Sequence, residues 1–193
     1  MYNAPALGEQ LRMSVARYSS FVLCLVLLLS PSSAISQDLD GPNHAFTDAL
    51  LDNLTGSWNL TGKVMGRTAD HTVEVEWVLN HQFLRIHEKA RNPAANGAVP
   101  YEAMIMIGYD NASERYIAHW NDTYGGRFSE TLGYGTRNGN DIRFVFEYPD
   151  GPFHTIFRWL PDSRQWTWLM EKKNKAAQWT EFATLTLARA TKN

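Results

Sequence analysis

The chain has 193 residues, of which 44% are hydrophobic, 12% are aromatic and 20% are charged, and its formal net charge at pH 7 is −2. A chain of this length can bury about two-thirds of its surface in one domain. Acidic and basic residues are interspersed without a long block of either sign. This pattern argues against a nucleic-acid partner and against binding to an anionic membrane surface.

The chain begins with a segment that has the three parts of a secretory signal peptide. Arg12 and Arg17 precede a run of nine apolar residues at 21–29, and small residues follow at Ser32 and Ala34. Nine apolar residues are too few to span a bilayer, which takes about 20. We therefore predict an exported protein, secreted or periplasmic.

Cleavage after Ala34 would leave a mature chain without cysteine, because the single cysteine, Cys24, lies in the leader. Such a chain has no disulfide, no thiol nucleophile and no thiolate metal ligand. The predicted organisation is a signal peptide over 1–34, a linker over 35–43 and one domain over 44–193, with no membrane span in the mature chain. Met13 is an alternative start that would give the leader a more ordinary length.

A short helix is expected at the start of the domain, capped by Asn43 or Thr47 and ending near Gly56. Its apolar side would consist of Phe46, Leu50, Leu51 and Leu54.

Short segments rich in aromatic and β-branched residues follow and are separated by turn residues such as Asn138-Gly139. The strands expected from them cover 57–65, 71–79, 83–91, 101–109, 115–121, 128–135, 142–148, 153–160, 165–172 and 178–189. Short connections between many strands predict an all-β fold, an up-and-down antiparallel barrel of about eight to ten strands with a short N-terminal helix. The longer loop at 92–100 is either a lid or portal at the rim, or a solvated connection.

Alternation of apolar and charged residues indicates which side chains enter the barrel. If the charged face is outside, at least eight large aromatic rings line the interior. Two strands leave the choice open. In the strand over 101–109, either Met104 and Met106 or Ile105 and Ile107 point inward. In the strand over 115–121, either Trp120 or His119 points inward. The candidate ligand-binding residues are Trp77, Ile86, Met104, Met106, Trp120, Phe144, Phe146, Phe157, Trp159 and Trp168.

An aromatic interior has two interpretations. Large rigid rings with adaptable methionines are typical of sites for apolar ligands, and eight or more strands can enclose one small molecule. Alternatively, the rings fill the barrel completely and leave no cavity.

The segment Leu54-Thr-Gly56-Ser-Trp58, between a helix and a strand, resembles the opening signature of the lipocalin-like (calycin) barrels. The resemblance extends to Arg189 and implies that Trp58 closes the barrel floor with Arg189 packed across it. The segment Glu74-Val-Glu-Trp-Val-Leu79 is similar to one in small bacterial exported lipocalin-like domains of unknown function. The chain departs from true lipocalins by lacking their cysteines, by having more strands and by ending without a trailing helix.

Haem-binding barrels of that superfamily open with Gly-x-Trp-x-Gly-x-Gly, which Asn59-Leu-Thr-Gly62 interrupts here. None of the six histidines has the spacing of a metal site, and no glycine-rich phosphate loop is found. The sequence therefore predicts no cofactor and no metal.

The sharpest enzyme hypothesis is an acid–base pair formed by Glu88 and His119. Alternation places Glu88 on the inward side, where an unpaired carboxylate is costly unless it lies at the rim, finds a partner or is protonated. His119 is the histidine that could line the interior beside it.

Three hypotheses follow from these observations. The favoured one is an exported protein that binds an apolar small molecule in the barrel. The alternatives are an enzyme of the same fold using Glu88 and His119, and a ligand-free structural or interaction domain.

Overall fold

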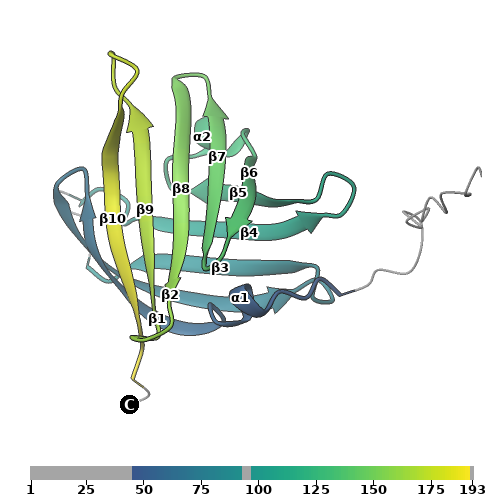
Figure 1. Cartoon of the computed structure of the whole chain (residues 1–193). Coiled ribbons are helices and arrows are strands. Elements are labelled where there is room, and N and C mark those ends of the chain that lie inside the picture. The colour runs from purple at the N-terminus through teal and green to yellow at the C-terminus, as the bar shows by residue number, and fades with distance from the viewer. Residues whose placement is uncertain (1–44, 93–96, 192–193) are drawn as a thin grey trace, which may run out of the picture. The chain divides into compact units, whose positions relative to one another are not determined.

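The computed structural model describes residues 45–92 and 97–191. The predicted signal peptide and linker, and the candidate cap Asn43, lie outside the described residues, as do residues 93–96 of the predicted rim loop. The described chain forms one closed barrel of ten antiparallel strands, which confirms the predicted fold class (Figure 1).

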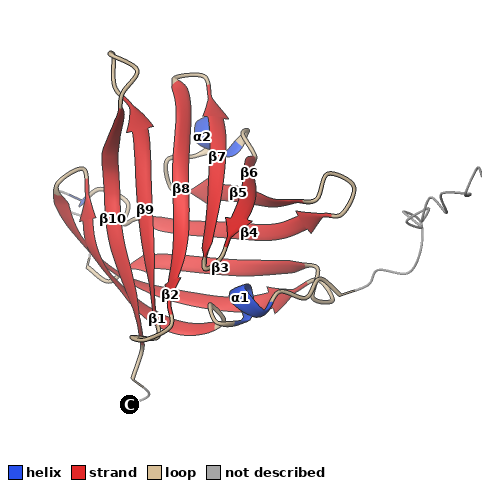
Figure 2. Ribbon diagram, in the orientation of Figure 1, coloured by secondary structure: helices blue, strands red, loops and turns tan. Residues whose placement is uncertain are grey.

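Each strand pairs with its neighbours in sequence, and the barrel closes where the first strand meets the last. Figure 2 shows strands forming nearly the whole wall. The strands are β1 (Gly56–Val64), β2 (Arg67–Val78), β3 (Phe83–Ala90), β4 (Glu102–Asp110), β5 (Arg115–Asp122), β6 (Gly133–Asn138), β7 (Asp141–Tyr148), β8 (Gly151–Leu160), β9 (Gln165–Lys173) and β10 (Trp179–Arg189).

Two single-turn helices lie at opposite ends of the barrel (Figure 1). Helix α1 (Ala49–Asp52) precedes β1 and covers one end, and α2 (Gly126–Ser129) connects β5 to β6 at the other end. We call these the α1 end and the rim. Among the described residues, no helix combines the length and the apolarity needed to cross a membrane.

The cap of α1 is Asp48, so the expectation of Asn43 or Thr47 as cap was wrong. The Asp48 carboxylate accepts hydrogen bonds from the backbone N–H groups of Leu50 (2.8 Å) and Leu51 (3.0 Å), as an N-cap does. Helix α1 is therefore shorter than expected, and Phe46 lies before it. The ring of Phe46 instead stacks on Tyr109, with 5.5 Å between centroids.

The floor of the barrel is formed by Trp58, which is 1% exposed. Its indole N–H donates to the carbonyl of Leu54 (2.6 Å), and the guanidinium carbon of Arg189 lies 3.9 Å from the ring centroid. Arg189 also donates to the carbonyls of Asn53 (3.0 Å) and Thr55. One side chain of the last strand thus joins the first strand to the segment that follows α1.

The alternation expected for β2, β3, β7, β8 and β9 is present in the structure. In the strand left open, Ile105 and Ile107 are inside and fully buried, whereas Met104 and Met106 lie on the outer face. The middle of the barrel is densely filled. The largest fully buried side chains of the barrel are those of Trp58, Trp166, Trp168, Phe144, Phe146 and Phe157.

The expected strand over 128–135 was wrong in position, because β6 begins at Gly133 and runs to Asn138. Gly125, with φ 83°, turns the chain into α2, so residues 126–129 are helical. This displacement leaves β5 and β6 joined by three paired positions, 116–118 of β5 with 133–135 of β6, whereas β4 and β5 share eight.

Two inward-facing glycines of β6 make room for phenyl rings of β7. Gly133 is paired with Phe146 and Gly135 with Phe144. A Cβ atom at Gly133 would lie 2.5 Å from the Phe146 ring, and one at Gly135 would lie 2.7 Å from the Phe144 ring. The absence of these two side chains lets the rings lie against the wall.

We predict that Gly135→Ala lowers the free energy of unfolding by about 1–3 kcal/mol, because the added methyl group overpacks the Phe144 ring. Gly126→Ala is the matched control, since a Cβ there meets nothing within 4 Å. Its effect should stay within about 0.5 kcal/mol. Urea denaturation of both variants measures the difference, and equal stability of the two would contradict the packing argument.

Candidate ligand-binding rim

Large aromatic side chains also face inward at the rim, but there they are only partly buried. We call this set, which is formed by Tyr101, Trp120, Tyr148, Phe153 and Phe182, the rim cluster. It contrasts with the middle of the barrel, where the rings are fully buried. Partly exposed rings on the inner face offer apolar surface that a small molecule can cover.

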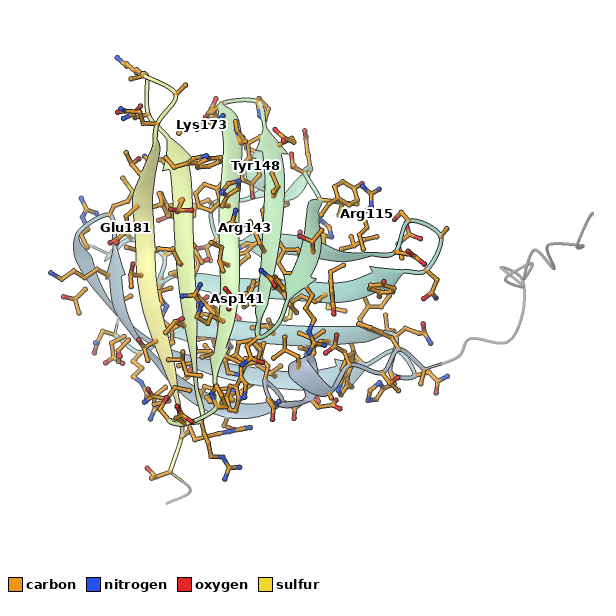
Figure 3. All side chains as sticks on the ribbon, in the orientation of Figure 1. Arg115, Asp141, Arg143, Tyr148, Lys173 and Glu181 are labelled. Atoms are coloured by element: carbon orange, nitrogen blue, oxygen red, sulfur yellow. The ribbon has the colours of Figure 1, made fainter. Side chains whose placement is uncertain are left out.

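Part of the rim cluster is a chain of ring contacts along β7, β8 and β10. The Tyr148 ring stacks on Phe146 with centroids 5.6 Å apart and contacts Phe153 edge-on at 6.0 Å. Phe153 contacts Phe182 edge-on at 5.1 Å. Figure 3 shows Tyr148 near the rim end of β7, whereas Asp141 lies towards the other end of the strand. These contacts hold the rings against one another.

The opposite side of the rim is formed by β4 and β5 and carries polar groups. The indole N–H of Trp120 donates to the hydroxyl of Tyr101 (3.3 Å). The Tyr101 ring also stacks on His71, with centroids 5.6 Å apart. Burial raises the pKa of Tyr101 far above its ordinary value, and the nearby carboxylates of Glu88 and Asp122 raise it further. This tyrosine therefore stays protonated.

A buried carboxylate lies beneath Tyr101. Glu88 is 2% exposed, and its Oε1 atom is 2.5 Å from Nδ1 of His71. The imidazole gives the carboxylate the partner that burial requires. In turn, the carboxylate fixes the orientation of the ring.

Asp122 is the second inward carboxylate at the rim. It accepts a hydrogen bond from the backbone N–H of Tyr124 (2.9 Å). Burial raises the pKa of Asp122, and hydrogen bonds from Tyr124, Tyr101 and Trp120 to the charged form oppose this rise. Burial first and the charge of Asp122 second raise the pKa of Tyr148 to about 12.

The two carboxylates lie in one row across the wall, with Glu88 paired with Ala103 and Ala103 paired with Asp122. Ala103 is the small residue between them, and its methyl group is buried. The inner face of the rim therefore combines aromatic rings with two acidic groups.

A separate cavity of about 580 Å³ lies at the α1 end. It is bordered by residues of both charge signs, including Asp48, Glu114 and Arg137. Asp48 is already engaged, because it accepts a hydrogen bond from the Tyr116 hydroxyl and lies 3.4 Å from Arg137. Burial first and this contact with Asp48 second raise the pKa of Tyr116 above its ordinary value. The polar groups here hold the α1 segment against the barrel.

The structure divides the predicted ligand-binding residues into four groups. Trp120 belongs to the rim cluster, and Met104 and Met106 face outward. Trp77 and Trp159 lie at the α1 end, where Trp77 donates to Asp52 (2.9 Å). The fully buried residues of the barrel are Ile86, Phe144, Phe146, Phe157 and Trp168.

The structure does not bring the predicted pair Glu88 and His119 together. His119 lies on the outer face of β5 and donates from Nε2 to the carbonyl of Ser129 in α2 (2.7 Å). Glu88 lies on the inner face and has His71 as its partner. The hypothesis of a Glu88–His119 acid–base pair is therefore wrong, because the histidine beside Glu88 is His71.

Sequence reasoning missed His71, Tyr101 and Asp122. A signal for His71 was present, because β2 and β3 form a hairpin in which Val73 pairs with Glu88. His71 is then the diagonal neighbour of Glu88 on the same face. Tyr101 and Asp122 lie at or beyond the ends of the expected strands, where alternation gives no guide.

Within the described ranges, no group of three His, Cys, Asp or Glu side chains is arranged to hold a metal ion.

Residues 44–189 match the model of a family described as Protein of unknown function (DUF1579). The comparison with curated proteins gives no match.

We predict that Tyr101→Phe raises the pKa of Asp122 further, because it removes a hydrogen bond that stabilises the charged carboxylate. Carboxyl carbon chemical shifts followed against pH by NMR measure the change. Tyr134→Phe is the control, since Tyr134 lies on the outside of β6 beneath Arg115. An Asp122 pKa that is the same in both variants would show that the Tyr101 hydroxyl does not bind this carboxylate.

Proposed function

The chain belongs to the DUF1579 family, and we propose that it is an exported protein that binds an apolar small molecule at the rim cluster of its barrel. The observation that carries the proposal is the contrast between the two regions of the interior. In the middle, aromatic rings are fully buried, whereas at the rim five inward aromatic side chains keep part of their surface exposed. Covering such apolar surface is favourable, at roughly 25 cal/mol per Å².

Export is the second part of the proposal. It is supported by the order of basic, apolar and small residues over 1–34 and by the lack of cysteine after Cys24.

Lipocalin-like (calycin) character is the third part. The Trp58–Arg189 contact and the closed antiparallel barrel support it, since that resemblance implies both.

A second candidate function is an enzyme of the same fold. The observation that favours it is the His71–Glu88 pair, in which a buried carboxylate orients an imidazole beside a protonated tyrosine. Such a pair could act as a general base on a molecule held at the rim.

Native mass spectrometry of the full-length gene product, recovered from outside the cytoplasm, tests export and binding together. We expect a chain that begins at Ile35 and carries a small-molecule adduct. A chain that keeps residues 1–34 would contradict export.

The same measurement on His71→Gln separates the two functions, because a binder keeps the same adduct, whereas an enzyme without its base holds unreacted substrate of a different mass.

We also predict that Phe182→Ala weakens binding of the neutral fluorescent probe N-phenyl-1-naphthylamine about tenfold, because it removes apolar surface from the rim. Leu79→Ala is the matched control, since Leu79 is an apolar side chain that is 67% exposed at the α1 end. Fluorescence titration gives the affinities, and thermal unfolding confirms that both variants are folded. An equal change in both variants would place the probe away from the rim.

A further inference from the structure

The rim cluster surrounds a carboxylate, and this arrangement indicates the chemistry of the ligand. We propose, on the basis of the binding function above, that the ligand has a cationic headgroup, a quaternary or protonated ammonium, held among Tyr101, Trp120 and Tyr148 against Asp122. The apolar part of the ligand would then lie on Phe153 and Phe182.

The first argument is the position of the aromatic rings. Trp120 and Asp122 are neighbours on the inner face of β5, and the Tyr101 hydroxyl accepts a hydrogen bond from the indole N–H near this carboxylate. Tyr148 lies on the inner face of β7 at the same end of the barrel, where its ring stacks on Phe146. Aromatic faces attract cations through the ring quadrupole, and several rings around one point form the arrangement that binds quaternary ammonium groups.

The second argument is charge. In the part of the chain that the structure describes, no ion pair involves Asp122, whereas some carboxylates outside the barrel pair with arginine. Asp141 lies 2.7 Å from Arg158, and Asp150 lies 2.9 Å from Arg127. Asp122 accepts a hydrogen bond from a backbone N–H, and the side chains near it, Tyr101 and Trp120, are neutral. The acidic charge inside the rim is therefore not neutralised by these partners.

The other charged groups at the rim favour the same position. Glu88 adds a second carboxylate in the same row, with His71 as its partner. Lys172 lies over Phe182 with its ammonium 5.5 Å from the ring centroid, on the β9–β10 side of the rim. The β9–β10 side therefore already has a cation of its own, the Lys172 ammonium. The acidic charge without a cationic partner lies on the β4–β5 side, at Asp122.

Three probes with the same decyl chain test the inference by isothermal titration calorimetry below their micelle concentrations. They are decyltrimethylammonium, 1-decanol and decyl sulfate, which differ in the charge of the headgroup. We expect the ammonium probe to bind about tenfold more tightly than 1-decanol, and decyl sulfate to bind least. The comparison uses the unaltered protein and does not depend on whether a variant folds.

Asp122→Asn should then lower the affinity for decyltrimethylammonium about tenfold and leave the affinity for 1-decanol unchanged. Asp162→Asn is the matched control, because it removes the same charge from an exposed turn at the α1 end. Equal affinity for all three probes, or an equal loss in the two variants, would overturn the cationic headgroup while leaving the apolar binding function intact. No binding of any probe would overturn the binding function and this inference with it.

Discussion

The contact between Arg189 and Trp58 is the interaction on which the barrel depends, because it lies where the sheet closes. Nine of the strand pairings join segments that are adjacent in sequence, whereas β1 and β10 are at opposite ends of the domain. Arg189 binds the indole face and two carbonyls of the segment between α1 and β1. The last strand, the first strand and the floor are thus fixed by one guanidinium, whose planar fork suits several acceptors at once.

A closed floor gives the two ends of the barrel different properties. At the α1 end, leucines of the helix segment and the indole of Trp58 are buried, and Asp48 binds both Tyr116 and Arg137. At the rim, the rings are partly exposed and the carboxylates face inward. The middle, filled by tryptophan and phenylalanine, separates the two. A ligand site at the rim therefore needs no continuous channel through the protein.

Alternation of side chains predicted most of the interior, because one face of each strand must be apolar when the other is charged. It worked for Val73, Val75 and Trp77, and it could not decide between Met104 and Ile105, since both are apolar. It failed over 128–132, where Gly125-Gly126 turns the chain into α2 and delays β6. The partner of Glu88 was missed for another reason: side-chain pairs across a hairpin depend on register, which single-strand patterns do not contain.

The short ladder between β5 and β6 makes the wall uneven in its resistance to local unfolding. Separating these strands breaks three pairings and the bond from His119 to α2, while the β4–β5 ladder breaks only when eight pairings are lost. Trp120 and Asp122 lie on β5 just beyond the last of the three pairings. The shortest ladder of the barrel wall is thus next to the carboxylate, which makes it the place where local separation of two strands would expose the inner face of the rim.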